Sequence, residues 1–125
     1  MKIATTVTQM IVRICALIQI VSGLLFWSGI GLEFVALHML SGLLLVLALW
    51  TLAILAIVAR VAVGIAALAV LWGVVVVAFG LTQSAILPVP NDLHWVIQVL
   101  HLLVGVAAVG LAENLGRRLK LRWLV

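Results

Sequence analysis

Residues 34–58 read FVALHMLSGLLLVLALWTLAILAIV, and His38 is the one ionisable side chain among them. A helix needs about 20 mainly apolar residues to cross the roughly 30 Å hydrocarbon layer of a bilayer, so this segment is long enough to span it. The whole chain has the same character, because 68% of its 125 residues are hydrophobic and 8% are charged. Soluble domains carry about 25% charged residues. These proportions exclude an ordinary soluble globule and predict an integral membrane protein.

The spans are located by charged residues and by glycines and prolines that interrupt helices. Apolar periodicity does not separate them, because nearly every position inside them is apolar. The predicted spans are about 14–30, 34–58, 61–81 and 93–115. The more polar residues 4–13 could extend the first span at its start. A chain of this length with short connections holds at most about four spans. We therefore predict an all-α fold, a four-helix transmembrane bundle that forms a single domain over residues 1–125.

The firmest predicted boundary lies before the fourth span. Pro88-Val89-Pro90 is the strongest stop signal in the chain. Asn91-Asp92 follows directly, and both residue types favour the N-cap position of a helix. We therefore expect these two residues to cap the fourth helix.

Charges of opposite sign fall on opposite sides of the predicted spans. Glu33 and Asp92 lie in the two connections on one side, and Glu113 is expected near the other boundary, paired with Arg13. All seven basic residues lie on that other side: Lys2, Arg13, Arg60, Arg117, Arg118, Lys120 and Arg122. The positive-inside rule then places both ends of the chain in the cytoplasm and predicts a multi-pass protein of the cell membrane. The net charge of +4 is explained by this asymmetry and by lipid head groups, without a nucleic-acid partner.

Three histidines fall within or beside the predicted spans, where ionisable side chains are costly and indicate function. His38 lies near the start of the second span, and His94 and His101 lie on the fourth. Both spans run in the same direction, so His38 and His101 approach a similar depth, roughly 6 and 12 Å below their helix starts at about 1.5 Å per residue. His94 is expected near the membrane surface.

The sequence repeats one short pattern around two of these histidines. Residues 37–42 read LHMLSG and residues 100–105 read LHLLVG, so both follow L-H-x-L-x-G. Gly42 and Gly105 each lie one turn deeper than a histidine on the same helical face, where the missing side chain leaves room for a flat group. This arrangement suits the edge of a porphyrin whose iron takes one imidazole from each side. The repeat is also compatible with duplication of a two-helix hairpin.

The helix count and the two L-H-x-L-x-G segments resemble small integral-membrane b-type cytochromes, in which histidines on parallel transmembrane helices ligate haem from both sides. The resemblance implies one haem b near the outer face, held by His38 and His101, and electron transfer to a quinone or another redox partner. His94 would then contact a propionate or replace His101 as the ligand. The chain departs from this pattern in having no histidine in the inner half, which limits it to one haem. It also has no basic residue on the outer side to pair with propionates.

Two other readings of the same residues stay open. Histidines inside membrane bundles also serve as hydrogen-bonding links between helices. The chain would then be an accessory subunit of a larger membrane complex without a cofactor. A chain of this kind could also form a homodimer. Zinc is disfavoured, because three histidines without a nearby acidic or cysteine ligand make a sparse set.

Overall fold

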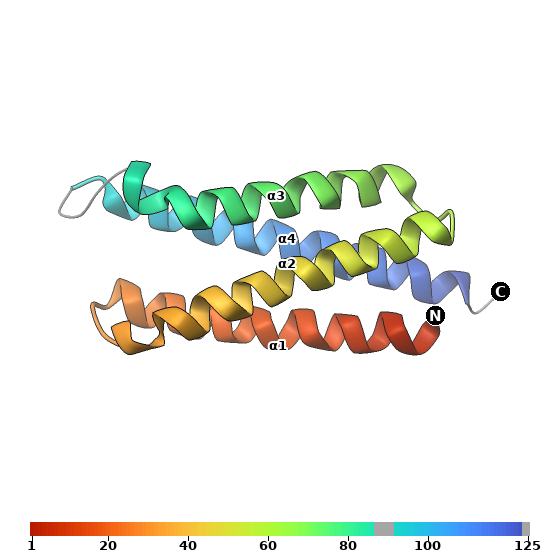
Figure 1. Ribbon diagram of the computed structural model, residues 1–125, viewed down its shortest axis with the longest axis horizontal. Coiled ribbons are helices and arrows are strands. Elements are labelled where there is room, and N and C mark those ends of the chain that lie inside the picture. The colour runs from red at the N-terminus through yellow and green to blue at the C-terminus, as the bar shows by residue number, and fades with distance from the viewer. Residues whose placement is uncertain (87–91, 124–125) are drawn as a thin grey trace.

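The structure is a computed structural model that describes residues 1–86 and 92–123. It contains helices α1 (Lys2–Trp27), α2 (Val35–Val58), α3 (Val63–Ile86) and α4 (His94–Arg122), with a short 3-10 turn, η1 (Leu32–Phe34), before α2 (Figure 1). All four helices are long and apolar enough to cross a membrane. No strand occurs among the described residues. The all-α, four-helix fold predicted from the sequence is confirmed.

Three helices are longer than the predicted spans, and one of them, α3, continues to Ile86 instead of ending near residue 81. α1 begins at Lys2, because its polar residues Thr5, Thr8 and Gln9 are buried and thus belong to the bundle. α4 continues to Arg122 instead of ending near residue 115. Its 29 residues measure about 43 Å at 1.5 Å per residue, which is more than the roughly 30 Å thickness of a hydrocarbon layer.

The connection between α1 and α2 is short and contains two glycines. α1 ends at Trp27 with Ser28 as its C-cap, and Gly29 and Gly31 adopt φ values of +75° and +77°, which glycine tolerates without steric cost. The N-cap residue of α4 is Leu93, so the expectation that Asn91-Asp92 caps this helix is wrong. Asn91 and the Pro88–Pro90 stop signal lie outside the described residues.

α2 and α4 form the centre of the bundle. They run in the same direction and pack against each other, whereas α1 and α3 lie on opposite flanks and make no contact within the described part of the chain (Figure 1). Small side chains let membrane helices approach closely, and alanines are frequent in this core. The core residues of these two helices include Leu49, Leu52, Ala53, Ala56, Ala108, Ala112, Leu115 and Leu119.

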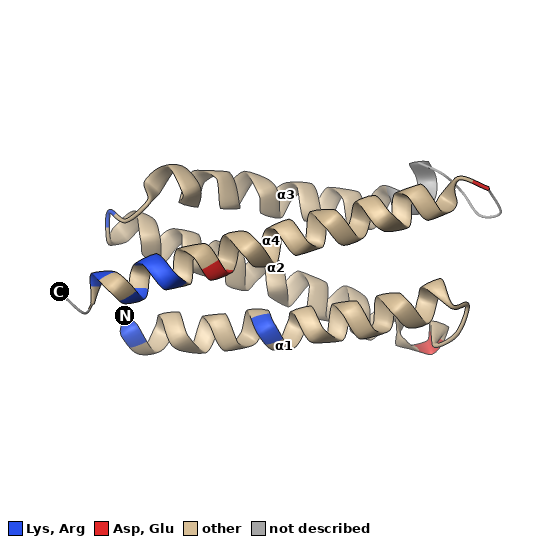
Figure 2. Cartoon of the chain, turned by 180° about the vertical axis from the view of Figure 1, so that it is seen from behind, with Lys and Arg blue, Asp and Glu red and all other residues tan. Residues whose placement is uncertain are grey.

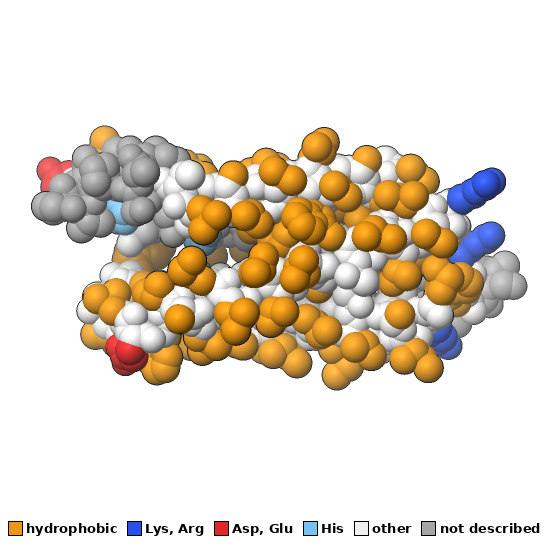
Figure 3. Space-filling model, in the orientation of Figure 1, with side chains coloured by type: hydrophobic (Ala, Val, Ile, Leu, Met, Phe, Trp, Pro, Cys, Tyr) orange, Lys and Arg blue, Asp and Glu red, His pale blue; other side chains and the backbone are white. Residues whose placement is uncertain are grey.

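The charges separate along the long axis of the bundle. The end that carries both chain termini and the α2–α3 connection holds the basic residues, and we call it the basic end (Figure 2). Glu33 and Asp92 lie at the opposite end, the acidic end, as the sequence predicted. Apolar side chains cover the surface between the two ends (Figure 3).

Candidate histidine site

His38 and His101 meet near the acidic end of the bundle. Their ring centroids lie 6.1 Å apart, with an angle of 38° between the ring planes. His38 lies in the first turn of α2, and His101 lies two turns into α4. The two helices are parallel, so residues at similar depths become neighbours across the bundle centre, as predicted from the sequence.

The Nδ1 atom of His38 lies 2.7 Å from the hydroxyl oxygen of Ser22 on α1. The Ser22 hydroxyl donates its single proton to the carbonyl oxygen of Ile18. With its proton on that carbonyl, the Ser22 oxygen is an acceptor for Nδ1–H in the tautomer of His38 that carries its proton on Nδ1. In that tautomer Nε2 keeps its lone pair and is the nitrogen of His38 that can bind a metal.

Gln19 of α1 links the helices one turn deeper. Its Nε2 donates to the carbonyl oxygen of His38 and to the hydroxyl of Ser41, the latter at 2.8 Å. A Cβ atom on Gly42 would lie 3.1 Å from the same Nε2. The space that Gly42 provides is therefore occupied by the Gln19 amide. Gly105 has open space beside it, so its predicted role of making room for a ring stays a prediction.

His101 presents a buried nitrogen without a partner. Its Nδ1 forms no hydrogen bond with any residue that the structure describes. The ring stacks on Phe79 of α3, with centroids 6.0 Å apart and an angle of 17° between the planes. An unsatisfied buried polar group costs about 1–3 kcal/mol. The His101 ring is thus held by stacking while this nitrogen lacks the hydrogen bond that a purely structural link would supply.

Glycines other than those predicted adjoin the two rings. A Cβ atom on Gly23 would lie 3.8 Å from Cε1 of His38, and one on Gly80 would lie 3.6 Å from Cε1 of His101. Phe26 also contacts His38, with ring centroids 5.3 Å apart. Each hairpin therefore surrounds its histidine with a glycine and a phenylalanine from the preceding helix.

Sequence reasoning did not assign these neighbours to the site. Ser22 could have been predicted as a site residue, because a hydroxyl group inside an apolar span needs a hydrogen-bond partner. The glycines and phenylalanines carried none, because their position beside a histidine depends on how the helices pair. The structure reveals them only through packing.

The molecule is hollowed at the acidic end. Figure 3 shows an opening between the α1–α2 half and the α3–α4 half, with histidine atoms visible at its edge. His94 is the first residue of α4 and is half-buried. It lies about 10 Å from His101 along the helix, at 1.5 Å per residue. Its assignment as a rival ligand or a propionate contact stays a prediction.

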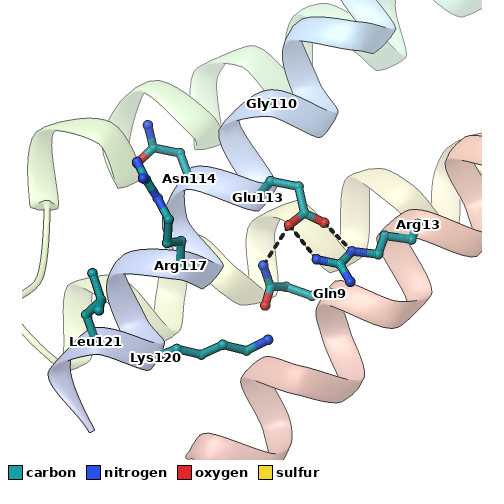
Figure 4. A pocket seen from close by; sticks show the side chains of 8 residues that line it. All are labelled: Gln9, Arg13, Gly110, Glu113, Asn114, Arg117, Lys120 and Leu121. Atoms are coloured by element: carbon teal, nitrogen blue, oxygen red, sulfur yellow. Dashed lines mark hydrogen bonds and ion pairs between the residues drawn. The ribbon is translucent and has the colours of Figure 1, made fainter. Parts of the chain in front are cut away.

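A second polar cluster lies toward the basic end (Figure 4). Arg13 of α1 forms a two-pronged ion pair with Glu113 of α4, with nitrogen–oxygen distances of 2.7 and 2.9 Å. Gln9 donates to the same carboxylate at 3.0 Å. The predicted Arg13–Glu113 pair is confirmed.

Comparisons with protein-family models, with curated proteins and with solved structures found no match to this chain.

Proposed function

We propose that this chain is a membrane-embedded haem b protein that carries electrons near the outer face of the cell membrane, and that His38 and His101 would hold the haem iron. The observation that carries the proposal is the pairing of these two imidazoles from parallel helices across the bundle centre. Intramembrane ionisable residues are costly, and two that converge on one point need a function or a partner.

The distance between the rings fits the ligand set. A metal–imidazole bond is about 2.0–2.1 Å long, so two imidazoles that held one metal ion would have ring centroids at most roughly 6 Å apart. The observed 6.1 Å is close to this limit. Figure 3 shows an opening at the acidic end, and Gly23 and Gly80 adjoin the two rings.

The hydrogen bond of Ser22 supports His38 as a ligand. Histidines that bind metals commonly donate their other ring N–H to a neighbouring acceptor, which fixes the tautomer and the ring orientation. Ser22 provides this acceptor for Nδ1 of His38 and leaves Nε2 available. On the opposite side, the stacked Phe79 orients the His101 ring.

Haem iron held by these residues would supply one-electron transfer. His38 and His101 would bind the group and Phe79 would orient the His101 ring. Both histidines are half-buried, and the exposure of such a group to water helps to set its reduction potential. A quinone or a protein at the acidic end would be the redox partner.

The alternative function is that of an accessory subunit in a larger membrane complex, with the histidines as links between helices. The Ser22–His38 hydrogen bond favours this reading, because it joins α1 to α2 without any cofactor. The unpartnered Nδ1 of His101 opposes it, because a structural link would use this nitrogen.

An absorption spectrum tests the proposal. The full chain is expressed with haem available, purified in detergent, and measured oxidised and then reduced with dithionite. We expect a sharp reduced α-band, and we expect His38→Ala and His101→Ala each to abolish it. His94→Ala is the matched control on α4 and should retain the band.

Two outcomes would change the assignment. Loss of the band in His94→Ala with retention in His101→Ala would move the second ligand one site outward. A wild-type protein that is helical by circular dichroism, monodisperse and colourless after haem addition would refute haem binding and leave the accessory-subunit function.

A further inference from the structure

A second pocket, distinct from the histidine site, lies toward the basic end. It has a volume of about 580 Å³ and lies along α4 beside α1 (Figure 4). Its polar lining comes from Gln9, Arg13, Glu113, Asn114, Arg117 and Lys120. A pocket with this lining in an otherwise apolar surface is a candidate binding site.

The lining carries three cations, Arg13, Arg117 and Lys120, and a single carboxylate, Glu113. Arg13 and Glu113 compensate each other through their ion pair. Arg117 and Lys120 form no ion pair or hydrogen bond with any residue in ranges 1–86 and 92–123. Both nevertheless line the same pocket, so it has an excess of two positive charges and attracts an anion.

The pocket reaches from polar to apolar surroundings. In the predicted orientation the basic end lies at the cytoplasmic face, which would put Arg117 and Lys120 at the level of the lipid head groups. Leu121 lines the pocket and is 56% exposed. Gly110 lies two to three turns closer to the bilayer centre and has open space where a Cβ would be. An acyl chain could lie over Gly110 while its head group contacts the cations.

Gln9 forms part of the same pocket wall, on α1. Its side chain is only 3% exposed, and its Oε1 has no hydrogen-bond partner among the described residues. Its Nε2 is already used by Glu113. The wall formed by α1 therefore contains a buried acceptor without a hydrogen bond, and the Gln9 side chain packs against Gly116 of α4.

We propose that this pocket binds one anionic phospholipid. Arg117 and Lys120 contact the phosphate, and Gly110 makes room for an acyl chain. The lipid lies between α1 and α4 and holds together the two helices that are joined there by the Arg13–Glu113 pair. The site is independent of haem.

Native mass spectrometry of the full chain tests the proposal. The delipidated protein is titrated in detergent with phosphatidylglycerol and with phosphatidylcholine of the same acyl chains. We expect one phosphatidylglycerol to bind at least about tenfold more tightly than phosphatidylcholine. The double variant Arg117→Gln/Lys120→Gln should weaken phosphatidylglycerol binding by roughly 10- to 30-fold.

The matched control removes the same number of charges from the same end of the bundle. Lys2→Gln/Arg122→Gln changes two cations that do not line the pocket, and we expect its affinity to stay within about twofold of the wild type. A second variant, Gly110→Leu, keeps all seven basic residues and fills the apolar part of the pocket. It should also weaken binding, and it tests the site even if the double variant does not fold.

Three results would overturn the proposal. Equal losses in the two double variants would show diffuse charge attraction rather than a site. Equal affinities for the two lipids would show that the phosphate is not selected by its charge. Displacement of phosphatidylglycerol by millimolar inorganic phosphate would show that the pocket binds free anions instead of a lipid.

Discussion

The Ser22 hydroxyl oxygen lies 2.7 Å from Nδ1 of His38, and its own proton is engaged by the carbonyl oxygen of Ile18. A residue on α1 thus determines which nitrogen of a histidine on α2 is free. Mutation of a residue that hydrogen-bonds to a metal-binding histidine commonly lowers metal affinity by about 10- to 100-fold. Ser22 is accordingly a positioning residue for the proposed ligand His38.

Ser22→Ala should weaken haem binding without removing the ligand. We expect haem affinity to fall by roughly 10- to 100-fold, because the ring loses the acceptor that fixes its tautomer. The reduced α-band should persist at saturating haem, with a shifted midpoint potential. Haem titration followed by absorbance measures the affinity, and a redox titration measures the potential.

Ser28→Ala is the matched control for this serine. Its hydroxyl donates to the carbonyl oxygen of Leu24 in the same helix and is exposed. It should leave both affinity and potential unchanged, and Ser22→Thr should restore most of the loss by keeping a hydroxyl. If Ser22→Ala binds haem as the wild type does, the positioning role is wrong.

Gly80→Leu should block the histidine site. Its Cβ would already lie 3.6 Å from Cε1 of His101, so the rest of a leucine side chain would occupy the space beside the ring. Gly64→Leu on the same helix is the control, because a Cβ there meets nothing within 4 Å. We expect the α-band to disappear in Gly80→Leu and to remain in Gly64→Leu. Equal spectra would show that a bound group does not use the space beside Gly80.

Gly73→Ala should destabilise the contact between α2 and α3. A Cβ at this position would lie 2.2 Å from Nε1 of Trp50, which donates to the carbonyl oxygen of Val70 at 3.1 Å. Moving the indole to relieve the overlap should cost about 1–3 kcal/mol of unfolding free energy. Unfolding in mixed micelles with increasing sodium dodecyl sulfate measures this change.

Gly64→Ala serves as the reference for that measurement, because it introduces the same methyl group into the same helix without a neighbour. Alanine is the better helix former, so this variant should be neutral or gain up to about 1 kcal/mol. A Gly73→Ala protein as stable as Gly64→Ala would mean that the indole rearranges freely.

The predicted orientation is tested by single cysteines in a Cys15→Ala background. Glu33→Cys lies at the acidic end and Trp123→Cys at the basic end. A membrane-impermeant maleimide added to intact cells should label Glu33→Cys, whereas Trp123→Cys should react only after lysis. The reverse pattern would place the basic end outside.

Charges and hydropathy were enough to predict the four helices and the separation of charge along the bundle. They were not enough to predict where α1 begins and α4 ends. Gln9 looked like a polar residue before a span, but it is buried, and a Cβ on Gly116 of α4 would lie 2.2 Å from its Cδ. The two helices stabilise each other's polar turns through this contact and the Arg13–Glu113 pair, which depend on tertiary packing.

The histidine pair followed from helix direction and depth, which the charge pattern determines. Its surroundings did not follow, because uniformly apolar helices carry no sequence signal for the face that each presents to its neighbours. The L-H-x-L-x-G pattern therefore predicted that Gly42 makes room for a ring. In the structure, Gln19 lies against that glycine, and Gly23 and Gly80 lie beside the histidine rings.

The separation of charge also affects how the chain enters a membrane. In the predicted orientation no lysine or arginine has to be translocated, and each of the two outer connections carries a single carboxylate, Glu33 or Asp92. Moving one elementary charge through the membrane potential is worth about 2.3 kcal/mol per 100 mV. A potential that is negative inside drives these carboxylates outward and holds the cations back. The energised membrane itself therefore favours insertion of this bundle in one direction.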